Sequence, residues 1–155
     1  MHIPRIFMLA FVTGVLLEGV VLPQERKIKR SDLPAAVDKT VTAQSQGAAI
    51  RGYSEEIENG KTYYEADLMV NGHSRDVLLD ANGTIAEVEE EAAFDKLPAA
   101  VREGLLVKVG MGKLLKVESI TKHDKLVAYE AQVLTGTKKS EVQVGPDGKP
   151  LDHEE

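Results

Sequence analysis

The chain has 155 residues, of which 43% are hydrophobic and 28% charged, a composition typical of a globular protein. Its net charge of −6 and its 5% of aromatic residues disfavour a nucleic-acid partner, because phosphate binding needs a basic surface and base stacking needs aromatic rings. The absence of cysteine excludes disulfides, thiolate nucleophiles and cysteine-based metal sites.

The amino terminus has the pattern of a secretory signal peptide. Arg5 precedes an apolar stretch at residues 6–17, which is shorter than the ~20 residues that a bilayer-spanning helix needs. We therefore expect a signal peptide at residues 1–23 and a basic linker at residues 24–31, with no membrane contact after signal removal. An uncleaved anchor or a buried first helix is the alternative, since no Ala-x-Ala cleavage site is visible.

The rest of the chain shows internal similarity. The letters LPAAV occur at residues 33–37 and again at 97–101, and Tyr-Glu-Ala follows both at nearly the same distance, at 64–66 and 129–131. Landmarks repeated in the same order indicate a duplicated unit. We divide the chain into a first unit at residues 32–90, a connector at 91–95 and a second unit at 96–152.

Each LPAAV stretch predicts the start of a helix. Pro34 and Pro98 fall in the first turn, and glycines follow the last one, which is the usual asymmetry of a helix. Gly104 lies inside the second helix and should weaken it. Apolar residues at i, i+4 and i+8 give each helix one stripe for burial: Leu33, Val37 and Val41 in the first, and Leu97, Val101 and Leu105 in the second.

Strand-like alternation follows each helix. In residues 62–70, Tyr64 and Leu68 share one face, while the other face carries Tyr63, Glu65 and Met69. Turn signals such as Asn-Gly and Asp-Gly separate the strands. The expected strands are 48–58, 62–70, 73–79 and 84–90, then 113–123, 126–134, 138–144 and 149–152. The expected fold class is α+β: two tandem repeats, each with one helix packed on a four-stranded antiparallel meander.

These stretches resemble the PepSY-like family, also described as β-lactamase-inhibitor-like domains. The resemblance lies in "LPAAV", "NGKTYYEADL" and "RDVLLDANGTI" of the first unit, and in outline in "DKLVAYEAQV" and "VQVGPDGKP" of the second. It implies small α+β units in exported bacterial proteins, periplasmic or secreted. It also implies binding of other proteins through the sheet face without helices, and a link to peptidase inhibition, without shared catalytic residues.

The sequence contains no catalytic, metal-binding or cofactor-binding constellation that we recognise, so we expect no cofactor and no enzymatic activity. The candidate binding residues are Tyr63, Glu65 and Met69, because Tyr and Met are favoured at interfaces, although a solvated sheet face explains the same alternation. The glutamates at 87–91 are interpreted as a solvated face and connector.

The function expected from these observations is that of an exported, non-enzymatic module that binds a protein or peptide through its open sheet face. Inhibition of an envelope enzyme is one role open to such a module. The alternative is small-ligand or calcium binding at acidic hairpin turns, such as residues 80–83, where Asp80 and Asn82 offer oxygen ligands. A plain hairpin turn explains the same residues without a metal.

Overall fold

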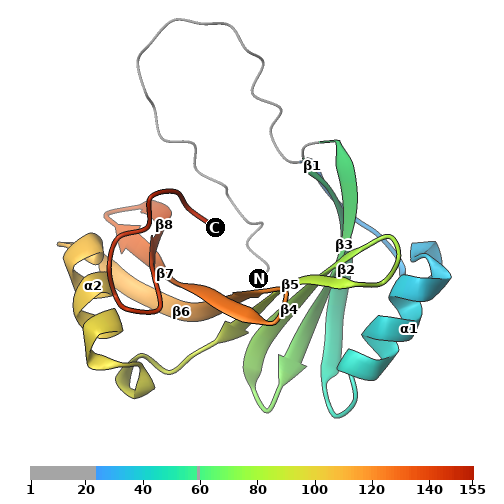
Figure 1. Ribbon diagram of the computed structural model, residues 1–155, viewed down its shortest axis with the longest axis horizontal. Coiled ribbons are helices and arrows are strands. Elements are labelled where there is room, and N and C mark those ends of the chain that lie inside the picture. The colour runs from blue at the N-terminus through green and yellow to red at the C-terminus, as the bar shows by residue number, and fades with distance from the viewer. Residues whose placement is uncertain (1–23, 59) are drawn as a thin grey trace, which may run out of the picture.

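The structure is a computed structural model that describes residues 24–155 except Asn59 (Figure 1). The predicted signal peptide at residues 1–23 lies outside the described residues. In chain order the helices and strands are β1 (Gln24–Lys27), α1 (Ala35–Gln44), β2 (Ala49–Glu58), β3 (Lys61–Val70), β4 (His73–Asp80), β5 (Ile85–Glu91), α2 (Ala99–Val109), β6 (Lys113–Lys122), β7 (Lys125–Thr135) and β8 (Lys138–Val144).

The strands form one continuous antiparallel sheet of eight, in the order β1 to β8. The expectation of two repeats, each with a helix on its own four-stranded meander, is therefore wrong. The sheet is continuous because β5 pairs with β6, from Glu87 opposite Lys122 to Glu91 opposite Glu118. This pairing gives hydrogen-bond partners to two strands that would otherwise be exposed edges.

The ends of the sheet also differ from expectation. Residues 24–27, expected to belong to a basic linker, form the edge strand β1, which pairs with β2 from Gln24 opposite Ile57 to Lys27 opposite Ser54. Residues 149–152 form no strand, because the chain turns back after β8, where the Gly145 amide donates to the Lys149 carbonyl at 2.8 Å. Pro150 could not have donated a ladder hydrogen bond.

The helices begin directly after Pro34 and Pro98 and bury the predicted apolar stripes. Val37 and Val41 of α1 pack with Ala66, Leu68, Val77 and Leu79 of β3 and β4. In a separate core, Val101 and Leu105 of α2 pack with Val117, Ala131, Val133 and Val144 of β6, β7 and β8. The sequence prediction of both stripes is confirmed.

Gly104 has a packing role that the sequence analysis missed. A Cβ atom at Gly104 would collide with the carbonyl group of Gly148, and one at Gly148 would collide with the carbonyl group of Ala100. Gly148 also has a φ of +79°, which favours glycine. The loop after β8 can therefore lie directly on α2 only because both positions lack a side chain.

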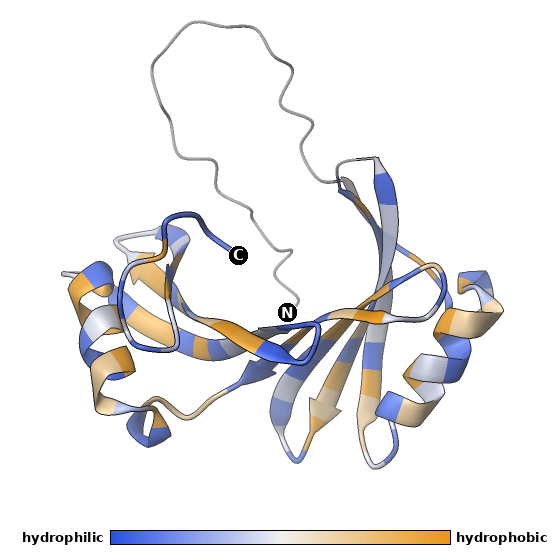
Figure 2. Ribbon diagram, viewed as in Figure 1, coloured by the Kyte–Doolittle hydropathy of each residue, from blue (hydrophilic) through white to orange (hydrophobic). Residues whose placement is uncertain are grey.

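Both helices lie on the same face of the sheet, which curls so that this face is convex and the helix-free face is concave (Figure 1). The strands carry hydrophobic and hydrophilic residues in alternation (Figure 2), as expected when the two faces have different surroundings. No helix among the described residues has the length and apolar character needed to cross a lipid bilayer. We call the concave, helix-free face the open face.

Candidate functional site

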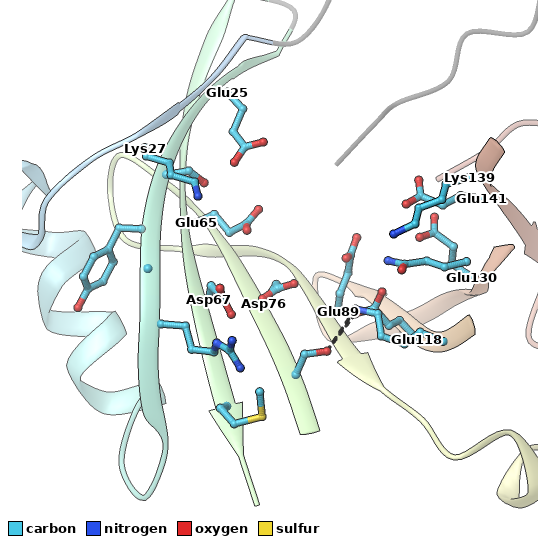
Figure 3. Close-up of a pocket in the computed structure, with 18 of the residues that line it drawn as sticks. Glu25, Lys27, Glu65, Asp67, Asp76, Glu89, Glu118, Glu130, Lys139 and Glu141 are labelled. Carbon is cyan, nitrogen blue, oxygen red and sulfur yellow. Dashed lines mark hydrogen bonds and ion pairs between the residues drawn. The ribbon is translucent and has the colours of Figure 1, made fainter. Parts of the chain in front are cut away.

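The open face encloses a hollow of about 480 Å³, to which all eight strands contribute lining residues (Figure 3). Among the described residues that line it, four carry a positive charge and eight carry a carboxyl group. We call this site the acidic hollow and define it by the eight acidic residues: Glu25, Glu65, Asp67, Asp76, Glu89, Glu118, Glu130 and Glu141.

The floor of the acidic hollow is a run of acidic residues on neighbouring strands. Asp67 of β3 lies directly opposite Asp76 of β4, which lies directly opposite Glu89 of β5. Glu118 of β6 lies opposite Glu130 of β7 in the same way. Three of these side chains are buried: Asp67 and Glu89 are each 8% exposed and Glu118 is 3% exposed.

Alternation along the strands places these acidic residues. Asp67 lies between Ala66 and Leu68, both of which face the α1 core. Its own side chain therefore points to the other face of the sheet. The same period places Asp76 beside Val77 and Glu89 beside Val88, so the apolar residues that build the cores fix the direction of the acidic ones.

Lys116 of β6 supplies a positive charge to this floor. Its ammonium group donates to Glu118 Oε1 at 2.6 Å and to Ser74 Oγ at 3.3 Å. Burial opposes the charged form of Lys116, but the hydrogen bond to Glu118 and the charges of Glu118, Asp76 and Glu89 outweigh it and raise the lysine's pKa. The floor therefore stabilises a partly buried ammonium group.

The same neighbourhood includes a group of carboxylates that could hold a metal ion. Oxygens of Asp76, Glu89 and Glu118 lie within 4.8 Å of one another. Lys116 is bonded to Glu118, and its pKa is raised by the charges of all three residues, so the chain's own ammonium group already neutralises part of this cluster. A divalent cation would have to compete with it.

Glu130, at the other end of the floor, differs from an ordinary glutamate in its protonation state. Burial raises the pKa of Glu130 to about 8, and the nearby charges of Glu141, Glu89 and Glu118 act in the same direction. The hydrogen bond that Gln143 Nε2 donates to Glu130 Oε2, at 2.9 Å, opposes this shift only in part. Glu130 therefore keeps its proton at neutral pH.

The carboxyl-terminal residues reach the open face beside Glu130. The backbone amide of Glu155 donates to Gln143 Oε1 at 2.8 Å, and the Glu155 side chain lies 3.4 Å from Lys122 Nζ. Gln143 thus connects the backbone of residue 155 to Glu130. The polar groups of this face can hold a peptide segment through its main chain as well as through its charges.

The three predicted binding residues all lie on β3, but they are not equivalent. Glu65 and Met69 line the acidic hollow, whereas Tyr63 is outside its lining. Lys61 Nζ lies 4.7 Å from the centre of the Tyr63 ring, a cation–π contact at the start of the strand. The structure brings Glu65 and Met69 together and leaves Tyr63 apart.

The sequence analysis missed most of the floor. Glu89 belongs to the 87–91 cluster that was interpreted as a solvated face, yet it is buried opposite Asp76. Glu118 and Glu130 were not recognised as candidates. The alternation of apolar and polar residues in each strand indicated the face on which these residues lie. Their proximity in space depends on the pairing of β5 with β6.

The acidic turn at residues 80–83 forms a hairpin. Asp80 Oδ1 accepts hydrogen bonds from the backbone amides of Asn82, at 2.9 Å, and Thr84, at 3.1 Å. Gly83 has a φ of +79° whereas Asn82 has no positive φ, so the turn is not the type I′ turn expected of an Asn-Gly pair. Asp80 Oδ1 therefore stabilises the turn through two backbone amides.

Comparisons with known proteins show similarity at the level of the fold. No family model matches the chain, and no curated protein matches it. A solved structure from Bacteroides eggerthii, described as a "putative periplasmic" protein, is 21% identical, with a TM-score of 0.64 and coverage of 77% of this chain and 86% of that one. A BLIP-like protein from Bacteroides fragilis is 23% identical, with a TM-score of 0.57 and coverage of 77% and 83%.

A third solved structure, a DUF2874 family protein from Bacteroides ovatus, is 18% identical, with a TM-score of 0.59 and coverage of 77% of this chain and 85% of that one. These identities show a shared fold and no more. The resemblance to β-lactamase-inhibitor-like proteins holds in this coarse sense, whereas membership of the PepSY-like family in two tandem copies is not confirmed. The chain has the fold of these BLIP-like and DUF2874 proteins.

Proposed function

We propose that this protein is an exported, non-enzymatic module that binds a segment of another protein or a peptide in the acidic hollow. The observation that carries the proposal is the hollow itself, which all eight strands build on the face that neither helix covers. A volume of about 480 Å³ is large enough for several side chains of a partner.

The character of the lining favours a macromolecular partner over a small ligand. Small-molecule pockets are lined mainly by apolar and aromatic residues, with few polar groups. Twelve ionisable residues line the acidic hollow, and Tyr53 is the one aromatic residue among the described residues of its lining. Charged surfaces of this kind guide protein association and select among partners.

Export to the periplasm is part of the proposal. It is supported by the signal-peptide pattern of residues 1–23 and by the description of the structural neighbour from Bacteroides eggerthii. The likeness to a BLIP-like protein supports a role as an inhibitor of an envelope enzyme.

Site-directed photocrosslinking tests the proposal. A photoreactive amino acid at Met69, in the hollow, should capture a defined partner in envelope extracts of the native host. The same amino acid at Ala43, exposed on α1, is the matched control and should not capture it. Capture from Ala43 alone, or equal capture from both positions, would rule out the open face as the binding surface.

A further inference from the structure

We infer that the occupant of the acidic hollow is a segment of a partner protein that carries several lysine or arginine side chains. This inference rests on the proposed function and names the chemistry of the partner. It follows from the charges of the lining, from an ammonium group that the floor already binds, and from the spread of the acidic residues over the open face.

The balance of charge in the hollow favours a cationic partner. Because Glu130 keeps its proton, seven carboxylates remain, and they outnumber the four positive side chains among the described residues of the lining, which are Lys27, Arg51, Lys116 and Lys139. The chain as a whole carries a net charge of −6. A basic segment is therefore attracted to the hollow at long range, and the carboxylates neutralise its charges on contact. An acidic segment is repelled.

Lys116 shows how the floor binds an ammonium group. Its Nζ atom contacts a carboxylate oxygen of Glu118 and the hydroxyl of Ser74, and nearby acidic charges keep it protonated despite burial. A lysine of a partner that enters the hollow would meet the same chemistry at Asp67 and Asp76, on the neighbouring strands.

The acidic residues of the floor also lie directly opposite one another on neighbouring strands. Like charges directly opposite each other on neighbouring strands destabilise a sheet. Asp67, Asp76 and Glu89 form two such pairs in succession. A bound cationic segment would add positive charge beside these carboxylates and reduce their mutual repulsion.

The distribution of the acidic residues favours a segment with several charges over a single ion. Glu25 and Glu65 lie on one wall of the hollow, and Glu130 and Glu141 lie on the opposite wall (Figure 3). A single cation held by Asp76, Glu89 and Glu118 would neutralise part of the floor but not the charges on the two walls. Several positive groups along one chain can satisfy both walls.

Binding of defined peptides to the intact exported protein tests the inference. A fluorescent lysine-rich peptide should bind with micromolar or better affinity at low salt, and a glutamate-rich peptide of equal length should not bind. Raising the ionic strength from about 50 to about 200 mM should weaken lysine-peptide binding several-fold, because salt screens exposed charges. Titration of the protein with calcium alone tests whether the hollow is a metal site.

Three variants locate the site. Asp76→Asn, in the floor, should weaken lysine-peptide binding about tenfold, and Glu65→Gln, at the wall, a few-fold. Glu103→Gln removes one negative charge from the exposed side of α2, on the convex face, and should leave binding within about twofold. Two hollow variants are used so that a folding defect in one leaves the other informative.

Three results would overturn the inference. One is equal affinity for the lysine-rich and glutamate-rich peptides. Another is an equal effect of the hollow variants and Glu103→Gln, and the third is calcium binding lost in Asp76→Asn without any peptide preference. If crosslinking from Met69 captures a partner whose contact segment lacks lysine and arginine, this inference fails while the binding function stands; without any capture, the binding function fails as well.

Discussion

On β6, the two faces of the sheet bury neighbouring side chains of different chemistry to the same extent. On β6, Val117 faces the α2 core and Glu118 faces the acidic hollow, and each is 3% exposed. The convex face buries its side chains under two helices, whereas the open face buries Glu118 by the curl of the sheet and by contact with Lys116. Burial in this protein therefore does not mark a hydrophobic residue, since the strand period alone decides which of two neighbours meets which surroundings.

The two faces also differ in what burial does to stability. Apolar side chains on the convex face gain about 25 cal/mol for each Å² removed from water. Carboxylates on the open face lose hydration and repel one another, and ion pairs such as that between Lys116 and Glu118 offset part of this cost. The two apolar cores of the convex face therefore stabilise the fold, while the acidic residues of the open face gain less from burial.

The largest expected effect is a charge placed on the convex face. Val101→Asp puts an unpaired carboxylate into the fully buried α2 core and should lower the free energy of unfolding by about 4 kcal/mol. Urea denaturation followed by circular dichroism measures it. Glu103→Asp, two residues away on the exposed side of α2, is the control, and equal midpoints for the two variants would contradict the packing of α2.

Gly104→Ala should give the next largest effect on stability. We expect a loss, whereas helix propensity alone predicts a gain. Alanine stabilises an isolated helix relative to glycine, but here the added methyl group meets the Gly148 carbonyl, so we expect a loss of about 1–3 kcal/mol. Gly52→Ala is the control, because nothing lies within 4 Å of its Cβ position and its φ is ordinary. A stabilised Gly104→Ala variant would show that the loop after β8 does not rest on α2.

Glu130 gives the open face a pH dependence. Its pKa rises from the usual 4.5 to about 8, so the folded state binds this proton more tightly than the unfolded state. The stability from this group is complete below about pH 4.5 and is lost as the pH rises through about 8. Glu130→Gln should flatten the fall of unfolding free energy over that range.

Urea denaturation at a series of pH values between those limits measures how steeply the free energy of unfolding falls with pH in the unmodified protein and in Glu130→Gln. The control is Glu103→Gln, which should keep the slope of the unmodified protein. A Glu130→Gln variant with an unchanged slope would show that another group binds the proton.

The smallest expected effect is a gain in stability on the open face. Asp76→Asn removes the central charge of the Asp67–Asp76–Glu89 run and should raise the free energy of unfolding by about 0.2–1 kcal/mol at low salt. The gain should shrink at high salt, because screening weakens the repulsion in the unmodified protein. A loss of stability would mean that Asp76 contributes more through its attraction to Lys116 than it costs through repulsion.

Local patterns in the sequence were enough to predict the two helices and the direction of most strand side chains. The i, i+4, i+8 stripes of Val37, Val41, Val101 and Leu105 are confirmed by the two cores. The alternation in residues 62–70 correctly separated Glu65 and Met69 from Leu68. These predictions succeed because backbone geometry sets the helical and strand periods within a few residues.

The candidate site was predicted only in part. The sequence indicated the open face and two of its residues, but it gave no sign that Asp76, Glu89 and Glu118 lie together. Each of these acidic residues belongs to a different strand, and their spacing along the chain carries no information on their distance in space. Gly104 was missed for a similar reason, because its partner Gly148 is far away in the sequence.

By itself, the sequence determined where the helices and most strands lie, which side chains share a face, and the overall negative charge. Only the tertiary structure decided that β5 pairs with β6, that the strands join into one sheet and that this sheet curls. The physical reason is range: periodicity and turn preferences act between neighbours in the chain, whereas strand pairing and curvature are selected by backbone hydrogen bonds and by packing between distant segments. The acidic hollow exists because those long-range choices bring residues from eight separate strands onto one concave face.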